Sequence, residues 1–226
     1  MTKDEVEEFF RRLSGAIPAP RTELEYENPF TLLVAVVLSA QATDAGVNKA
    51  TPALFAAADT PWKMLALGET RLRDYIRTIG LFNTKAKNIV KLSQALIERF
   101  GGEVPRERGL LESLPGVGRK TANVVLNEAF GHETIAVDTH VFRVSNRTGL
   151  ARGKTPIAVS DKLERIVPER FRRGAHHWLI LHGRYVCTAR KPDCPRCVVR
   201  TLCRYRAKTT VAAAPRRSRE RKTAHG

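Results

Sequence analysis

This chain of 226 residues has no long hydrophobic run. Its longest strongly apolar stretch, Leu32 to Leu38, is far shorter than the ~20 residues that span a bilayer. The amino-terminal residues are polar and acidic, so neither a secretory signal peptide nor an arginine-rich transit peptide is expected. These absences argue against a secreted or membrane protein, and they predict a cytoplasmic one.

Acidic side chains are also scarce. The chain has 23 Asp and Glu residues against 39 Lys and Arg, a formal net charge of +16. Such an excess predicts a polyanionic partner, either nucleic acid or an acidic membrane surface. Because no membrane segment is expected, nucleic acid is favoured. Hydrophobic residues make up 42% of the chain, enough for a core in one large domain or two small ones.

Cysteine is absent from the first 186 residues. All four cysteines follow with the spacing C-x6-C-x2-C-x5-C, at Cys187, Cys194, Cys197 and Cys203. A disulfide scaffold would spread its cysteines over the fold, and a cytoplasmic chain keeps them reduced. Four thiolates so close in sequence suit a zinc ion or an iron–sulfur cluster. The spacing lacks the paired C-x2-C of a zinc ribbon, which favours a cluster without excluding zinc or four buried structural thiols.

No segment shows the alternation typical of a β-strand. Apolar residues recur instead at helical spacing, as at Leu72, Tyr75, Ile76 and Ile79. Residues 31–42 are apolar on nearly all sides, which predicts a buried central helix. The fold class is therefore predicted to be all-α.

The most informative local motif covers residues 111–122. Pro115 ends one helix, Gly116 and Gly118 provide a tight turn that a Cβ would obstruct, and a new helix begins at about Arg119. The free N–H groups of this turn and the positive end of the helix dipole form a seat for a phosphate. This pattern is typical of a helix–hairpin–helix, which contacts one DNA backbone without reading bases. An ordinary αα-hairpin is the alternative.

Two residues in or after this motif are candidates for chemistry. Lys120 lies in the first helical turn, where the helix dipole, Arg119 and partial burial all favour the neutral amine that a nucleophile needs. A plain phosphate-binding lysine fits the same position. Asp138 follows an apolar run and is expected to cap a helix by accepting from the N–H of His140 or Val141. A carboxylate held in this way could also stabilise positive charge on a sugar.

The remaining histidines have no second motif beside them. His140, His176, His177 and His182 are therefore expected to be packed or hydrogen-bonded structural residues rather than ligands or bases.

Several stretches together resemble the endonuclease III family of DNA repair glycosylases over about residues 1–206. They are Leu38–Asp44, Leu114–Val125, Val137–His140, His177–Arg184 and the cysteine spacing. The resemblance implies two α-helical lobes with a DNA-binding cleft between them and a [4Fe–4S] cluster on the four cysteines. It places a helical bundle at 22–132, with the helix–hairpin–helix at about 108–131, and a cluster domain at 1–21 plus 133–206. The basic tail at 207–226 has no apolar periodicity and is expected to be disordered; it either attracts DNA or is solvated without a role.

The resemblance also implies an activity. The chain is expected to remove oxidised pyrimidines of the thymine glycol type from duplex DNA in base excision repair. It would then cleave the strand by β-elimination through a Schiff base, acting on abasic sites as well. Lys120 would be the nucleophile and Asp138 the catalytic carboxylate, while Gln41 and Leu81 would fill the gap left by the extruded base. The residues expected to contact DNA are Gln41, Leu81, Gly116, Val117, Gly118, Arg119, Thr121, Arg190 and Lys191. A monomer associated with a prokaryotic nucleoid is expected.

Two alternatives remain. A related adenine-mismatch glycosylase shares the hairpin and the cluster, but it typically lacks the lysine and carries an added carboxy-terminal domain. Here Lys120 is present and only a short tail follows the cysteines. A non-enzymatic helix–hairpin–helix module would need neither Lys120 nor Asp138.

Overall fold

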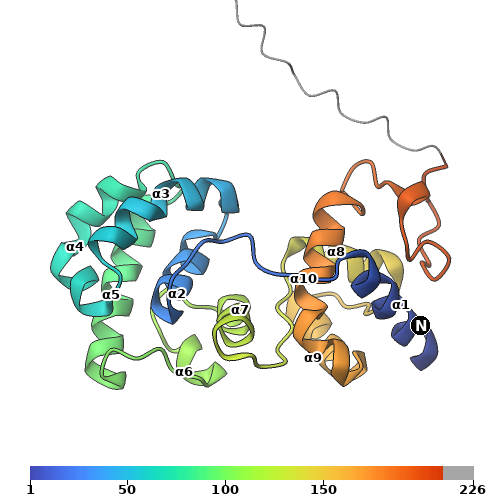
Figure 1. Ribbon diagram of the computed structural model, residues 1–226, viewed down its shortest axis with the longest axis horizontal. Coiled ribbons are helices and arrows are strands. Elements are labelled where there is room, and N and C mark those ends of the chain that lie inside the picture. The colour runs from blue at the N-terminus through green and yellow to red at the C-terminus, as the bar shows by residue number, and fades with distance from the viewer. Residues whose placement is uncertain (211–226) are drawn as a thin grey trace, which may run out of the picture.

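The computed structural model describes residues 1–210, and these form ten α-helices, one 3-10 turn and no strand, so the all-α prediction is confirmed for this part of the chain (Figure 1). The elements are α1 (Lys3–Ala16), α2 (Pro29–Leu38), α3 (Asp44–Ala57), α4 (Pro61–Ile76), α5 (Phe82–Phe100), α6 (Arg108–Glu112), α7 (Arg119–Phe130), α8 (Thr139–Thr148), α9 (Pro156–Ile166), α10 (Glu169–Tyr185) and η1 (Cys194–Arg196). None of the described helices is long and apolar enough to cross a membrane.

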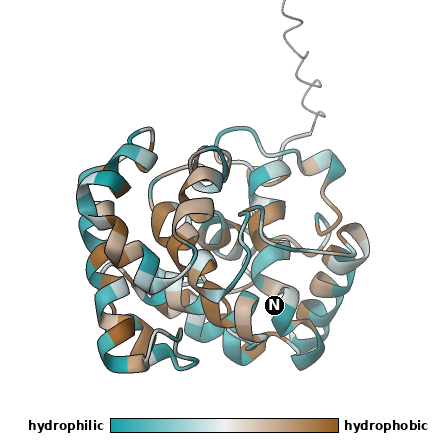
Figure 2. Cartoon of the chain, turned by 60° about the vertical axis from the view of Figure 1, so that its left-hand side comes forward, coloured by the Kyte–Doolittle hydropathy of each residue, from teal (hydrophilic) through white to brown (hydrophobic). Residues whose placement is uncertain are grey.

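The helices pack around two separate hydrophobic cores. One core is formed mainly by α2–α7, and the other by α1, α8, α9 and α10 together with the cysteine segment. Figure 1 shows the two groups side by side, and Figure 2 shows hydrophobic residues gathered toward the inner helices of each. We call them the first and the second lobe. The domain limits 22–132 and 1–21 plus 133–206 stay a prediction, which these two cores support.

The chain passes from the first lobe back to the second along residues 131–138. Ile135 and Val137 lie in the second core, whereas Ala136 between them lies in the first. This alternation follows from extended backbone, in which successive side chains point to opposite sides. The crossover therefore delivers Asp138 to the junction of the lobes.

Helix α2 is the centre of the first lobe, with nine of its ten residues buried. Asn28 caps it by accepting from the Thr31 N–H, and Pro29 occupies the first turn, where its missing N–H has no consequence. The helix ends at Leu38, earlier than the predicted residue 42, because a tight turn follows in which the Ala42 N–H donates to the Ser39 carbonyl. Gln41 thus lies in a loop.

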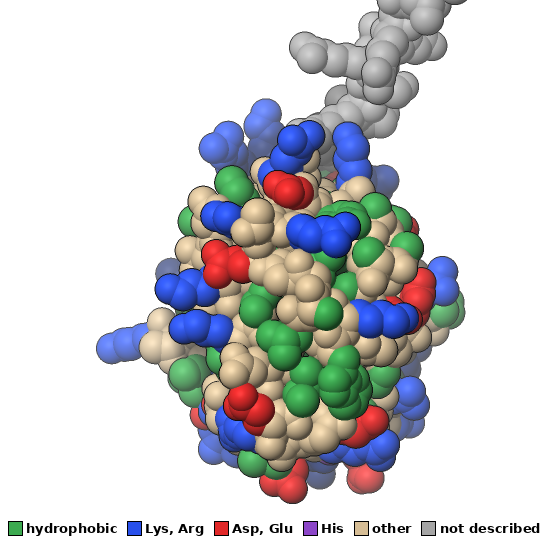
Figure 3. All heavy atoms as spheres, turned by 90° about the vertical axis from the view of Figure 1, so that its left-hand side faces the viewer, with side chains coloured by type: hydrophobic (Ala, Val, Ile, Leu, Met, Phe, Trp, Pro, Cys, Tyr) green, Lys and Arg blue, Asp and Glu red, His purple; other side chains and the backbone are tan. Residues whose placement is uncertain are grey.

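Basic side chains spread over the surface of the first lobe. Figure 3 views the molecule from the left-hand end of Figure 1, and there Lys and Arg surround the face while Asp and Glu are fewer. The positive excess counted in the sequence is therefore a surface property available to a polyanion.

Candidate active site

The hairpin between α6 and α7 depends on one glycine for its turn. Gly116 has a φ of +79°, and a Cβ there would lie 3.1 Å from the Asn88 Cβ. Gly118 differs from the prediction, because its φ is −102° and an added Cβ would meet nothing within 4 Å. No neighbouring group of this chain therefore excludes a side chain at position 118, and the space in front of α7 is open.

Helix α7 begins with unpaired backbone donors. Gly118 is its N-cap and provides no side-chain cap, while the Ala122 N–H makes the first intrahelical bond, to the Gly118 carbonyl. The N–H groups of Arg119, Lys120 and Thr121 consequently have no partner within the helix. With the helix dipole they form an anion seat.

Two of the residues predicted to contact DNA, Val117 and Thr121, have buried side chains. The Val117 side chain is buried in the first core, and its N–H donates to the Leu114 carbonyl. The Thr121 side chain is also buried, which leaves its N–H as the group that faces the open end of the helix. Sequence spacing does not reveal which side of the hairpin packs on the core.

Lys120 is half-buried at the junction of the two lobes. It lines a pocket of about 260 Å³ whose walls come from α7, the 131–138 crossover and α9. The other lining residues are Arg119, Asn123, Val137, Pro156, Ile157 and Ser160. Lys120 thus shares a pocket with residues of both lobes, among them Val137, which immediately precedes Asp138.

Asp138 caps α8 as predicted, and it accepts from both expected donors. Its Oδ1 lies 2.9 Å from the His140 nitrogen and 2.8 Å from the Val141 nitrogen. Two N–H bonds to one oxygen hold the carboxylate in a fixed orientation. Lys120 and Asp138 therefore each stand at the amino end of a helix, one from each lobe.

The pKa of the buried His176 imidazole depends on the charges of both Lys120 and Asp138. His176 is buried, and its Nδ1 lies 2.8 Å from the Ala136 carbonyl oxygen. Burial lowers the pKa of His176, the Asp138 carboxylate raises it, and the charge of Lys120 lowers it further. The fold thus brings Lys120 and Asp138 near the same side chain, although 18 positions separate them in the sequence.

Each buried histidine has a polar partner, as expected for packed or hydrogen-bonded structural residues. His177 Nε2 lies 3.0 Å from Glu128 Oε1, and His182 Nε2 lies 3.6 Å from Cys197 Sγ. Burial lowers the pKa of His177 to about 3 and that of His182 to about 4.

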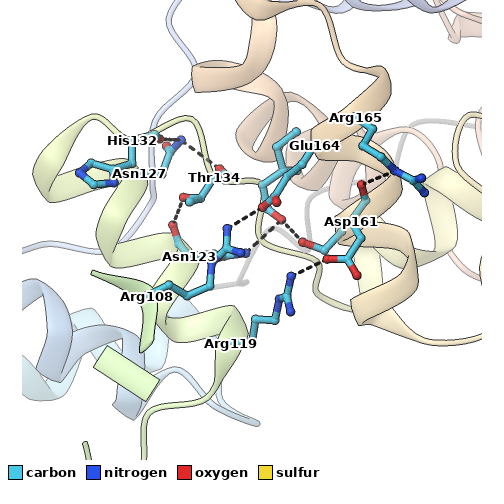
Figure 4. A network of polar contacts seen from close by, with 11 residues as sticks. Arg108, Arg119, Asn123, Asn127, His132, Thr134, Asp161, Glu164 and Arg165 are labelled. Carbon is cyan, nitrogen blue, oxygen red and sulfur yellow. Dashed lines mark hydrogen bonds and ion pairs between the residues drawn. The ribbon is translucent and has the colours of Figure 1, made fainter. Parts of the chain in front are cut away.

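Two ion pairs join the hairpin to α9 of the second lobe (Figure 4). Arg108 Nη2 lies 2.9 Å from Glu164 Oε1, and Arg119 Nη2 lies 2.5 Å from Asp161 Oδ1. Arg119 was expected to contact DNA; here its Nη2 binds Asp161, and its contact with DNA stays a prediction. Sequence reasoning missed both acidic residues, because they lie 42 and 56 positions away from their partners.

Side chains of α7 also hold the crossover (Figure 4). Thr134 Oγ1 donates to the Asn123 carbonyl at 2.7 Å, and Asn127 Nδ2 donates to the His132 carbonyl at 2.9 Å. These bonds fix the segment that carries Asp138 to the helix that carries Lys120.

Gln41 and Leu81 share an unusual backbone conformation. Their φ values are +54° and +61°, and within residues 1–210 no other non-glycine residue has a positive φ. A leucine in this region is strained, and strain of this kind concentrates at functional sites. The Leu81 side chain is 58% exposed. Helical spacing alone would assign Leu81 to the core and Gln41 to the surface, so only the family resemblance identified them.

The four cysteines are free, and all four line one cavity. Among the described residues, no three His, Cys, Asp or Glu side chains are placed to hold a single metal ion. A zinc ion needs sulfurs about 2.3 Å away on all sides. Four thiols that line one cavity are also the donor set of an iron–sulfur cluster.

Donors to sulfur add to this fit. Arg147 Nη1 lies 3.6 Å from Cys187 Sγ, and the Tyr205 N–H donates to Cys203 Sγ at 3.4 Å. Such donors stabilise thiolate ligands and tune iron–sulfur centres. Burial raises the pKa of Cys197 to about 11, so that thiol is protonated when no metal is bound.

The loop 188–193 between the first two cysteines is anchored and presents cations. Arg147 donates to the carbonyls of Thr188 and Ala189 at 2.8 and 3.0 Å. Arg190 and Lys191, both expected to contact DNA, are exposed on this loop.

The ordered chain continues past the predicted limit at residue 206. Thr209 Oγ1 donates to the Pro192 carbonyl at 2.6 Å and accepts from the Cys194 N–H at 3.2 Å, while Lys208 lines the cysteine cavity. The first residues of the predicted tail therefore contact the cysteine loop, and the limit at residue 206 stays a prediction. The remainder of the tail, 211–226, lies outside the described residues.

Comparison with known proteins gives a uniform result. Residues 34–169 match the family described as HhH-GPD superfamily base excision DNA repair protein. The chain is 59% identical to Endonuclease III of Haemophilus influenzae, covering 92% of this chain and 99% of the relative, and 56% identical to that of Escherichia coli, covering 93% and 100%. A solved structure of a trapped Endonuclease III–DNA covalent intermediate is similar with a TM-score of 0.86 and 47% identity, covering 90% of this chain and 96% of that one.

Proposed function

Since this chain belongs to the endonuclease III family of HhH-GPD base excision repair proteins, and is therefore a DNA glycosylase with AP lyase activity, we propose that it acts on oxidised pyrimidines of the thymine glycol type in duplex DNA. The observation that carries this proposal is that Lys120 of the first lobe and Asp138 of the second both act on the charge of one buried imidazole, His176, and that Lys120 lines a pocket with Val137, the residue before Asp138. The covalent intermediate trapped with a relative supports a nucleophilic mechanism.

In this mechanism Lys120 is the nucleophile. Its neutral amine attacks C1′ of the damaged nucleotide, and the bond from C1′ to the base breaks. The base leaves with the electron pair and takes up the proton that the newly formed ammonium at Nζ gives up. The sugar ring then opens as O4′ is protonated, which leaves a Schiff base between C1′ and Nζ. Loss of a C2′ proton and of the 3′ phosphate nicks the strand by β-elimination.

Asp138 stabilises this chemistry from the second lobe. Its carboxylate faces positive charge that develops on the sugar while the base departs, and it assists proton transfer. Because the cap holds the carboxylate rigidly, little reorganisation is needed during the reaction.

The hairpin and the two strained loops would bind and distort the duplex. The N–H groups at the start of α7 hold a phosphate, and the open space at Gly118 lets the backbone approach closely. Gln41 and Leu81 fill the gap left by the extruded base, whose unstacking is easier when it is damaged.

A cleavage assay tests the proposed function. The wild-type chain is incubated with a duplex that contains one thymine glycol, beside an undamaged duplex and one with an adenine mismatch. We expect a nick 3′ to the lesion without added alkali, and only in the damaged duplex. Excision of the mismatched adenine, with strand breakage only after hot alkali, would instead support the monofunctional alternative.

We propose that the four cysteines hold a [4Fe–4S] cluster, which when bound would brace the basic loop 188–193 against DNA. The purified protein is expected to be yellow-brown with broad visible absorbance, and Cys203→Ala to lose most of it. A colourless protein with one zinc per chain by elemental analysis would contradict this assignment.

Binding to undamaged DNA is expected to weaken steeply with salt, because phosphate contacts release counterions. Each contact contributes about −0.9 to the slope of log K against log salt concentration, so Arg190→Gln with Lys191→Gln should reduce its magnitude by about 2. The control Lys63→Gln removes a cation already paired with Asp59 and should change the slope little. A flat salt response in the wild type would contradict the phosphate-binding role of the surface.

We propose further that the protein works as a monomer in the cytoplasm, associated with the nucleoid where its substrate lies. The high positive charge supports this placement.

A further inference from the structure

Lys85, in the first turn of α5, has an unusual environment. Its side chain is buried, with the residue only 5% exposed, and its Nζ donates to the Leu38 carbonyl at 2.9 Å. Burial lowers the pKa of Lys85, and no carboxylate forms an ion pair with it in the described part of the chain. Lysine is rarely buried without an ionic partner, so a specific role for the Lys85 amine is indicated.

The partner of Lys85 is the end of α2. Leu38 is the last residue of that helix, so its carbonyl belongs to the group that lacks intrahelical donors. The negative end of the helix dipole lies there and favours a cation. Gln41 follows three residues later, after the turn that ends the helix.

The backbone of Lys85 is bound to the second strained loop. Its N–H donates to the Leu81 carbonyl at 3.0 Å and closes the first turn of α5. Leu81 is the N-cap of this helix and has no side-chain cap of its own. Lys85 therefore joins two loops. Its side chain binds the helix end that precedes Gln41, and its backbone N–H binds Leu81.

The two loops also approach each other directly. A Cβ added to Gly80, next to Leu81, would lie 3.9 Å from the Gln41 carbonyl oxygen. Both Gln41 and Leu81 have left-handed backbone, which persists only where the surroundings hold it. We propose that Lys85 is the positioning residue that holds Gln41 and Leu81 at a fixed separation for insertion into the DNA duplex, an inference that rests on the proposed function.

The physical reason is preorganisation. Insertion at the lesion requires both side chains to arrive together, and loops that must first be ordered lose part of the binding free energy. A misplacement of about 1 Å at a distance from the chemistry reduces a rate by up to about 100-fold. Methionine in place of Lys85 would fill a similar volume but leave the Leu38 carbonyl without its donor.

The test measures unstacking separately from cleavage. Full-length wild type, Lys85→Met and Leu81→Ala are mixed with a duplex that carries a non-cleavable abasic analogue opposite 2-aminopurine, whose fluorescence rises when it unstacks. We expect Lys85→Met to lose most of this rise and to excise thymine glycol about 10- to 100-fold more slowly, while Lys85→Arg recovers much of both. The control Lys91→Met removes an exposed cation from the same helix and should behave as wild type.

A double-variant comparison decides whether Lys85 acts through these loops. If it does, the double variant Leu81→Ala/Lys85→Met should give the same 2-aminopurine fluorescence as Leu81→Ala alone, because the effects of coupled residues do not add. Additive losses, or a folded Lys85→Met with wild-type fluorescence, would overturn the proposal; circular dichroism and thermal melting establish folding. If the wild type unstacks the duplex but does not excise thymine glycol, the proposed substrate is refuted. A loss of the fluorescence rise in Lys85→Met would still support the role of Lys85.

Discussion

Replacing Lys120 with alanine is expected to abolish strand cleavage while DNA binding is retained. The variant removes the amine that forms the covalent bond, and loss of a nucleophile reduces turnover by roughly 10⁴-fold or more. Binding persists because the phosphate is held by backbone N–H groups at the start of α7, which alanine keeps. Borohydride reduction of the wild type on thymine glycol DNA should give a covalent protein–DNA adduct, and Lys120→Ala should give none.

The matched control is Lys162→Ala, which removes a half-buried lysine from α9 next to Asp161. It should trap as efficiently as wild type. An adduct that persists in Lys120→Ala would show that another amine is the nucleophile. Lesion excision by the wild type without any adduct would reduce Lys120 to a phosphate contact, the other interpretation that its position allows.

The second large effect is expected at Asp138, where two substitutions separate catalysis from helix capping. Asn is as good an N-cap as Asp, so Asp138→Asn should keep the bonds to the His140 and Val141 N–H groups and melt like wild type. Its loss of charge should slow excision by about 10²- to 10⁴-fold, the range for general acid–base groups. Asp138→Ala should slow the reaction similarly and also lose about 1 kcal/mol of stability. Single-turnover excision and thermal melting measure the two properties.

Thr155→Ala provides the control for capping. Thr155 caps α9 through the Ala158 N–H, so this variant should lose similar stability and keep its activity. Asp138→Asn should also affect cleavage of a preformed abasic site less than base excision, since no glycosidic bond has to break there. Wild-type excision by Asp138→Asn would mean that Asp138 is a cap and nothing more.

In the hairpin, local sequence predicts the turn correctly but not the space around each of its two glycines. Pro115 and Gly116 predict the turn because a proline ends a helix and a positive φ favours glycine at the next residue. The same reasoning assigned an internal clash to Gly118, yet the position is open in the folded chain. Whether a Cβ has room depends on neighbours from other segments, which spacing does not specify.

The partner of a charged side chain is likewise not given by local sequence, as Arg119 shows. Its place beside Lys120 predicts a phosphate contact, but the side chain is bound to Asp161 of α9. Lys85 is a stronger case, because a lysine in an amphipathic helix is expected at the surface and here fills a buried site at the end of α2. Both partners are contributed by helices that are distant in the chain.

The sequence by itself determined the helical class, the N-cap at Asp138, the turn at Gly116 and the grouping of the cysteines, because these depend on residues a few positions apart. Only the tertiary structure decided that Lys120 and Asp138 both lie near the buried His176, that Arg119 pairs with Asp161, and that Lys85 joins the loops of Gln41 and Leu81. Those contacts arise when the apolar faces of separate helices are buried together. Burial sets the distances between polar side chains, and no pattern along the chain contains them.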